Sequence, residues 1–146
     1  MSKNNINNSS MGMLSSIWGP PLWHYLHTIS FNYPLEPTSI QRKQYKKLMI
    51  NLGDTLPCKY CRINYEKNLK AVPLNAYALK NRNTFSRWMY RLHCHVNDIL
   101  RKKTNITYEE VRNKYNAFRA TCQKSTSGCT NPMNKKGKTK CTLKFN

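Results

Sequence analysis

The chain has 146 residues, the length of one small domain, and its 25 Lys and Arg against 6 Asp and Glu give a net charge of +19. Such an excess favours nucleic acid, acidic membrane surfaces or acidic proteins as partners, although heavy use of Lys and Asn is equally typical of an AT-rich coding sequence. No segment approaches the ~18 apolar residues of a membrane span, and the N-terminus lacks the apolar stretch of a secretory signal. The composition therefore excludes a membrane span and predicts a cytoplasmic protein whose six cysteines serve chemistry or metal binding rather than a disulfide scaffold.

Five helices are predicted in chain order, and no segment alternates as a strand does, so the chain is predicted to be all-α. The helices cover about residues 18–33, 38–56, 57–69, 84–101 and 107–118. Sequence signals mark three of their starts, namely the pair Pro20–Pro21 and the capping boxes Thr38–Gln41 and Thr107–Glu110. The fourth helix carries the longest apolar stripe, formed by Phe85, Trp88, Met89, Leu92, Val96 and Leu100.

Two flexible tails are predicted around one helical domain. Residues 1–16 are polar, rich in Asn and Ser, and aperiodic. Residues 119–146 are basic, free of Asp and Glu, and punctuated by Gly, Pro, Ser and Thr, and they contain Cys122, Cys129 and Cys141. The helical domain is therefore expected to span residues 17–118.

The stretch LPCKYCRINY supports three hypotheses about Cys58 and Cys61, which stand in a C-x-x-C spacing behind a proline. A zinc half-site needs two further ligands, which residues 93–95 (HCH) or the tail cysteines offer, but no second C-x-x-C and no H-x₃₋₅-H is present. A thioredoxin-type dithiol would follow a strand, whereas a helix is predicted before this one. A redox dithiol at a helix start is favoured over zinc, because the helix dipole and the cations Lys59 and Arg62 all stabilise a thiolate on Cys58.

Three motifs in this order, WGPPLWHYLHTISFNYP, LPCKYCRINY and FSRWMYRLHCHVNDILRK, resemble the Erv/ALR family of FAD-linked sulfhydryl oxidases. The family pattern is a W-G-x-x-x-W-x-x-L-H opening, a helical P-C-x-x-C and an H-N-x-V-N-x-x-L-x-K helix, and the match covers about residues 18–118. The resemblance implies a bundle of four main helices plus a short fifth, usually homodimeric, with FAD held inside beside the C-x-x-C. The trimmed form of the chain resembles members encoded by large cytoplasmic DNA viruses, which implies a location in the host cytoplasm, a virus factory or the virion.

The resemblance also assigns roles to individual residues. Cys58 and Cys61 would be the catalytic pair, and no metal site is implied. The cofactor-binding residues would be Gly19, Trp23, His27, Tyr33, Cys61, His93, Cys94, Val96, Asn97, Leu100, Lys102 and Tyr115. His93 and Asn97 are four residues apart and so share a helix face, as a joint ligand site requires. His24 matches no family position and is expected to lie in solvent.

The chain departs from the family pattern at two places. Cys94 replaces an asparagine, which puts a thiol where an amide is expected. Many cellular members have a disulfide between cysteines at the positions of Tyr90 and about Thr107, and this chain has neither cysteine.

The activity implied by the resemblance is the formation of disulfides. A thiolate of a protein dithiol, or of a thioredoxin-like carrier, would attack Cys58, and electrons would pass through Cys61 and FAD to O₂, giving H₂O₂. Cys129 and Cys141 would form a shuttle pair, with Cys122 and Cys129 as the alternative pair. The rival hypothesis is a non-enzymatic, zinc-stabilised helical module that binds nucleic acid through the charge of +19.

Overall fold

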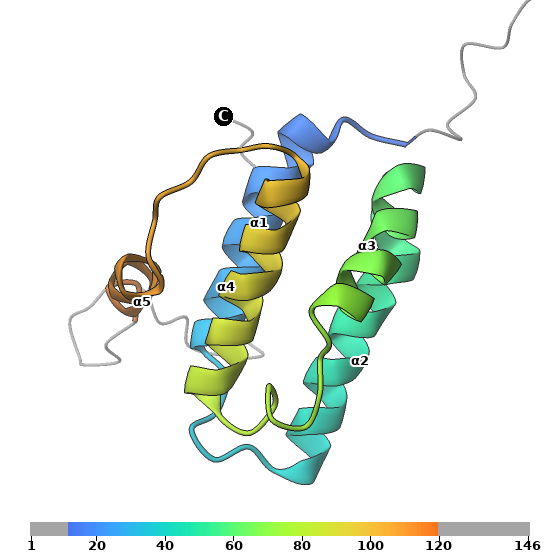
Figure 1. Cartoon of the computed structure of the whole chain (residues 1–146). Coiled ribbons are helices and arrows are strands. Elements are labelled where there is room, and N and C mark those ends of the chain that lie inside the picture. Colours follow the sequence, from blue (N-terminus) through green and yellow to red (C-terminus); the bar gives the residue numbers. More distant parts are fainter. Residues whose placement is uncertain (1–11, 120–146) are drawn as a thin grey trace, which may run out of the picture.

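The computed structural model of the chain, drawn in Figure 1, describes residues 12–119. It contains five α-helices, α1 (Ser15–Phe31), α2 (Ser39–Thr55), α3 (Lys59–Ala71), α4 (Arg82–Ile99) and α5 (Tyr108–Asn116). Over the described range there is no β-strand, and a single bridge pairs Gly12 with Cys58. The predicted all-α fold is confirmed, and each helix lies within a few residues of its predicted place.

The four main helices form two layers that pack into a bundle. α1 packs against α4 and α2 packs against α3, while α3 also contacts α4 and so joins the layers. In Figure 1 α5 is seen almost end-on, so it crosses the direction of the other helices, and it contacts both α1 and α4. None of the helices described here is both long and apolar enough to cross a membrane.

Capping boxes explain where three of the helices begin. Both predicted capping boxes, at Thr38 and Thr107, are formed. In each, the threonine side chain accepts from the backbone amide three residues later, and the side chain of that later residue accepts from the threonine amide. A third box, Asn81 with Thr84, starts α4 inside a segment that was expected to be a loop. Threonine in the last position of a box is outside the usual S/T-x-x-E/Q pattern, which is why the sequence did not indicate this start.

The core draws on all four main helices, and the polar ends of its aromatic rings are paired. Its largest fully buried side chains are Tyr33, Phe85, Met49, Met89 and Leu92. The indole of Trp88 donates to the carbonyl of Val72 at 3.1 Å, and the hydroxyl of Tyr33 donates to the carbonyl of Leu79 at 2.9 Å. These rings therefore contribute their buried area without leaving a donor unsatisfied.

Helix α4 ends in a turn whose backbone is left-handed at Arg101. The Arg101 amide bonds the carbonyl of Asp98 at 3.0 Å, and the Lys102 amide bonds the carbonyl of Asn97 at 2.9 Å. This pair of bonds is a Schellman motif, which requires a positive φ at the residue after the cap, and φ of Arg101 is 54°. The motif turns the chain so that Lys102 lies near the end of α4.

Arg101→Gly is expected to raise the free energy of unfolding by roughly 0.5–1 kcal/mol, because glycine adopts a positive φ without the steric cost of a side chain. Urea denaturation measures the change. The matched control is Arg91→Gly, at an exposed interior position of the same helix, which should lower the free energy of unfolding by about 1 kcal/mol. Two changes of the same sign would contradict the assignment of the turn.

The helical domain begins before residue 17, its predicted start. α1 starts at Ser15, and Gly12 and Met13 lie against Pro57 and Cys58. Residues 12–16 therefore belong to the fold and not to the predicted N-terminal tail. The contact joins segments far apart in the sequence, so no local pattern indicates it. The tail cysteines Cys122, Cys129 and Cys141 lie outside the described residues.

Candidate active site

Cys58 and Cys61 form a disulfide at the N-terminus of α3, with their Cα atoms 5.1 Å apart. Cys58 is the N-cap residue, one position before its predicted place in the first turn, because its backbone is extended. The amide of Cys61 donates to the Cys58 sulfur at 3.2 Å. A helix N-terminus favours negative charge, so this position stabilises a Cys58 thiolate whenever the disulfide opens.

The two sulfurs face different surroundings. Cys61 packs against the main core, as do the half-buried rings of Trp18 and Trp23. Cys58 is instead bridged to Gly12 at the edge of the bundle. Both cysteines are half-buried, but only Cys61 is directed to the core, so Cys58 is the sulfur that we expect a substrate to attack.

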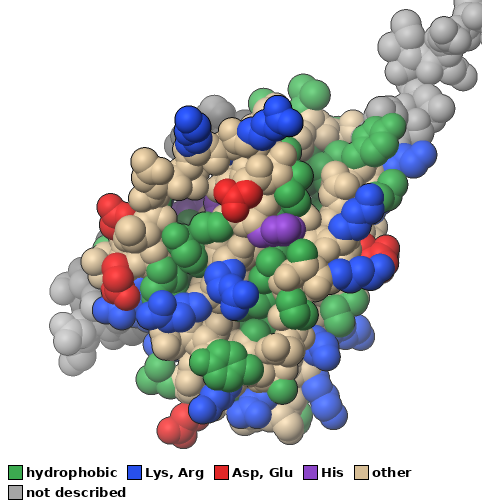
Figure 2. All heavy atoms as spheres, viewed as in Figure 1, with side chains coloured by type: hydrophobic (Ala, Val, Ile, Leu, Met, Phe, Trp, Pro, Cys, Tyr) green, Lys and Arg blue, Asp and Glu red, His purple; other side chains and the backbone are tan. Residues whose placement is uncertain are grey.

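Cations surround the disulfide in sequence and in space. Lys59 and Arg62 lie in the first turns of α3, and the Arg62 guanidinium donates to the carbonyl of Leu56 at 2.7 Å, which fixes it beside the helix start. Figure 2 shows Lys and Arg side chains spread over the visible face of the bundle with few acidic side chains among them. This setting favours thiolates and negatively charged partners.

A cluster of aromatic rings joins α1, α4 and α5. The rings of Trp23 and His93 are stacked, with centroids 4.0 Å apart and planes within 6°. His27 Nε2 lies 3.0 Å from His93 Nδ1, and the ring of Tyr115 stacks on His27 at 5.3 Å. We call these residues, with His24, the aromatic cluster. The structure thus brings together four of the residues that the resemblance assigned to the cofactor.

Both imidazoles of the central hydrogen bond are held neutral. Burial, followed by the proximity of His93, lowers the pKa of His27 to about 3. Burial, followed by the cation of Lys102, lowers the pKa of His93 to about 4. One ring must donate and the other accept, so protonating both would break the hydrogen bond.

The cluster has the features of a site for a flat heteroaromatic group. His27 Nδ1 is buried and has no hydrogen-bond partner among the described residues. A buried polar atom without a partner is costly, and a bound polar group would satisfy it. Trp23 and His93 are half-buried and offer ring faces for stacking beside it, whereas the ring of Tyr115 is buried between His27 and Phe31.

His24 is the site residue that the sequence reasoning missed. Its ring is exposed, as expected, but His24 Nδ1 lies 3.2 Å from the hydroxyl of Tyr115. His24 precedes His27 by three residues and therefore shares its helix face, a signal that was present in the sequence. The partner, Tyr115, could not be found this way because it lies on α5.

The other predicted cofactor residues fall into three groups. The first group lies on α4 within four residues of His93 and is half-buried: Cys94, Val96 and Asn97. Lys102 is close enough to lower the pKa of His93. Leu100 is at the surface, and Gly19 is half-buried, although a Cβ on Gly19 would meet no other atom within 4 Å. Tyr33 is a core residue.

The ring and hydrogen-bond contacts of Tyr33 are with Tyr45, Phe85, Leu79 and Arg82 rather than with the aromatic cluster. The structure therefore does not bring Tyr33 to the other predicted cofactor residues. Its place after the histidines in the first motif gave no sign of this, because α1 ends at Phe31 and the chain turns there.

The position of the family's additional disulfide is held by other contacts. The hydroxyl of Tyr90 donates to the carbonyl of Ile106 at 2.8 Å, next to the start of α5. The Tyr90 ring packs edge-on against Tyr108, and the Arg87 guanidinium lies 4.0 Å from the centroid of the same Tyr108 ring. Burial and then the neighbouring Cys94 raise the pKa of Tyr90, so its hydroxyl stays a donor. These contacts tie α5, and with it Tyr115, to α4.

The zinc hypothesis finds no support in residues 12–119. Cys58 and Cys61 are joined to each other and are not free as thiolate ligands. Across the part of the chain that the structure describes, no three His, Cys, Asp or Glu side chains gather where a metal ion could bind.

The fold and the site define a helical bundle with a C-x-x-C disulfide at a helix start and an aromatic cluster beside its core. Residues 20–127 match the Erv1 / Alr family. A probable FAD-linked sulfhydryl oxidase of Acanthamoeba polyphaga mimivirus is 33% identical over 94 residues, which are 64% of this chain and 65% of that protein. The FAD-linked sulfhydryl oxidase ERV1 of Arabidopsis thaliana is 34% identical over 84 residues, 58% of this chain and 42% of that protein. The chain therefore spans less than two thirds of the length of these relatives.

Solved structures agree with the sequence match. The crystal structure of the FAD binding domain of Erv1 from Saccharomyces cerevisiae aligns with a TM-score of 0.64 and 27% identity, covering 72% of this chain and 96% of that chain. The bundle of four helices with a short fifth, implied by the resemblance, is thereby confirmed. The chain belongs to the Erv1 / Alr family.

Proposed function

We propose that this chain is an FAD-dependent sulfhydryl oxidase that forms disulfides in protein thiols. The observation that carries the proposal is the Cys58–Cys61 disulfide at the start of α3. Cys61 packs on the same core as Trp23 of the aromatic cluster. Its relatives, named FAD-linked sulfhydryl oxidases, support the same activity.

The disulfide would accept electrons by two exchanges. A substrate thiolate attacks Cys58, so a mixed disulfide forms, the Cys58–Cys61 bond breaks and Cys61 leaves as a thiolate. A second substrate thiolate then attacks the first substrate sulfur, which releases the substrate disulfide and leaves a thiolate on Cys58. The amide of Cys61, 3.2 Å from the Cys58 sulfur, stabilises that leaving thiolate.

The aromatic cluster would hold the cofactor. His27 Nδ1, which lacks a partner among the described residues, would pair with a polar group of FAD, the half-buried rings of Trp23 and His93 would stack on its flat parts, and Tyr115 would support His27 from behind. FAD, when bound, supplies the two-electron chemistry that returns the dithiol to a disulfide. The chain's own part is to orient the group and to keep both imidazoles neutral beside it.

The partners that fit this proposal are reduced protein dithiols or a thioredoxin-like carrier, with O₂ as the final electron acceptor. Exposed apolar side chains on α1 and α2, such as Tyr25 and Ile50, support a homodimer in which these helices meet. A location in the host cytoplasm fits a protein whose disulfide cycles instead of serving as a permanent crosslink.

The purified full chain is expected to be yellow, to show flavin absorbance, and to consume O₂ when dithiothreitol is added. The flavin released by denaturation should equal the protein in amount. The rival nucleic-acid module predicts a colourless protein that releases stoichiometric zinc to a chelator and consumes no O₂. An oxygen electrode, an absorbance spectrum and a zinc assay on one preparation separate the two.

A further inference from the structure

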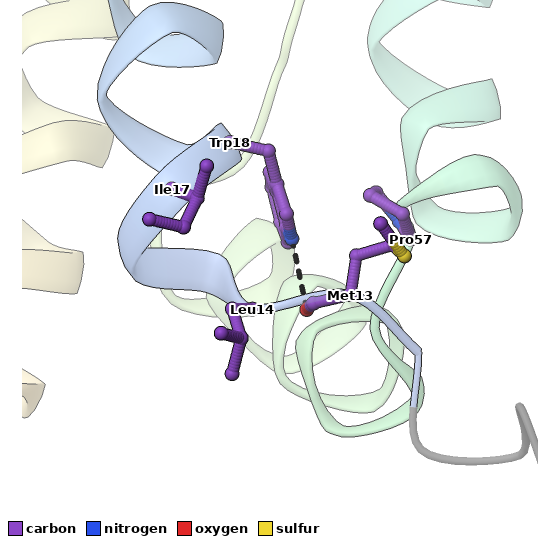
Figure 3. A pocket seen from close by; sticks show the side chains of 5 residues that line it. All are labelled: Met13, Leu14, Ile17, Trp18 and Pro57. Atoms are coloured by element: carbon purple, nitrogen blue, oxygen red, sulfur yellow. Dashed lines mark hydrogen bonds between the residues drawn. The ribbon is translucent and has the colours of Figure 1, made fainter.

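We propose that an apolar groove beside Cys58 binds an apolar side chain of the protein substrate next to the cysteine that is oxidised, and that the site prefers acidic segments. The groove is lined by Met13, Leu14, Ile17, Trp18 and Pro57, and Figure 3 shows the Trp18 ring standing between Ile17 and Pro57. This inference rests on the proposed oxidase function and adds its substrate class.

The groove is fixed to the disulfide by backbone bonds. The Met13 amide donates to the carbonyl of Pro57 at 2.6 Å, and Gly12 is bridged to Cys58. Gly12 has a φ of 85°, and a Cβ there would come within 2.8 Å of the Cys58 Cα, so only glycine fits this approach. The indole of Trp18 donates to the Met13 carbonyl at 3.0 Å, drawn as a dashed line in Figure 3. A side chain in the groove is thereby held at a set place relative to the Cys58 sulfur.

The size and exposure of the groove indicate a peptide side chain as the occupant. Its volume is about 230 Å³, below the roughly 300–1,000 Å³ of pockets for small molecules. Met13, Leu14 and Ile17 are 69%, 73% and 72% exposed. Three neighbouring apolar side chains in water beside a reactive sulfur are typical of a surface that another protein covers.

Charge favours a separate, acidic substrate over the chain's own C-terminal segment. Lys59 and Arg62 flank the Cys58 side of the disulfide, and Asp54 is the acidic residue nearest to it in sequence. Residues 120–146 contain several lysines and no Asp or Glu, so these cations repel them. A substrate with Glu or Asp beyond its cysteine is attracted instead, which raises its rate of encounter.

The test compares reduced two-cysteine peptides as substrates of the full, FAD-loaded chain. The first peptide has leucine beside its first cysteine and glutamates further on, the second has serine in place of the leucine, and the third has lysines in place of the glutamates. We expect the first peptide to have a KM about tenfold below that of either other peptide. The second peptide lacks one aliphatic side chain that the first buries in the groove, and the third lacks the attraction between its glutamates and the cations. Ile17→Ser should remove the leucine preference.

The matched control is Ile40→Ser, another exposed isoleucine in the first turn of a helix, and it should keep the preference. Truncation after residue 121 should also keep it. Loss of the preference on truncation would show that the C-terminal segment mediates binding, and a change of oligomeric state in Ile17→Ser would show that a second copy covers the groove. Either result, or a preference that survives in Ile17→Ser, overturns the proposal.

A second readout needs no flavin. In Cys61→Ser, the free Cys58 thiolate attacks a peptide whose cysteine is bound to 5-thio-2-nitrobenzoate, forms a Cys58–peptide disulfide and releases the coloured thiolate. The Cys58→Ser/Cys61→Ser double variant gives the background from other cysteines. The leucine peptide should react about tenfold faster than the serine peptide. This preference together with absent dithiothreitol oxidation would reject the oxidase function and leave the groove standing, whereas oxidation without the preference would reject the groove alone.

Discussion

Cys58→Ser and Cys61→Ser are each expected to abolish dithiothreitol-dependent O₂ consumption, a loss of at least about a hundredfold. The disulfide that accepts electrons from the substrate needs both sulfurs, so removing either one removes the reaction. Without Cys58 there is no outer sulfur for the substrate to attack, and without Cys61 no thiolate can leave toward the interior. An oxygen electrode measures the loss.

The same variants should keep their flavin and fold. Both sulfurs lie at the start of α3, whereas the rings assigned to the cofactor lie on α1, α4 and α5. Flavin absorbance and the thermal midpoint serve as internal controls in each preparation. Substantial turnover by either single variant would reject the disulfide as the electron entry, and loss of the flavin together with activity would leave structural damage as the cause.

Local sequence was sufficient to predict the helices and the position of the disulfide. The boxes at Thr38 and Thr107 are complete within four residues, so they were predictable without any knowledge of the fold. The C-x-x-C spacing likewise places two sulfurs one helical turn apart, within the reach of a disulfide.

Contacts between distant segments were beyond this reasoning. The strand-like bridge of Gly12 to Cys58 and the bond of His24 to Tyr115 each join parts of the chain that no short motif contains. The resemblance named Tyr33 from its place in a motif, whereas packing directs its ring into the core against Phe85. A motif assigns residue types to positions, and the turn after α1 decides where such a side chain lies.

The second large effect is expected from acid. His27 and His93 have folded-state pKa values of about 3 and about 4, against 6.5 for an ordinary histidine. Between pH 6.5 and the folded-state pKa values, these two histidines are protonated in the unfolded chain and neutral in the folded chain. The free energy of unfolding therefore falls as the pH is lowered through this range, and above pH 6.5 these two groups contribute no dependence.

Urea denaturation at about pH 7.5 and about pH 5.5 should show a loss of roughly 1.4 kcal/mol for each of the two histidines, an upper limit since His93 is only half-buried. FAD is kept at a fixed excess, because ligand bound to the folded state adds its own stabilisation. His93→Phe preserves a flat ring against Trp23 and removes one titrating group, so its pH dependence should be about half as steep. His95→Gln, outside the ring contacts of the cluster, should keep the full dependence. Equal stability at both pH values, or an unchanged slope in His93→Phe, would show that the buried imidazole pair does not govern the acid sensitivity of this fold.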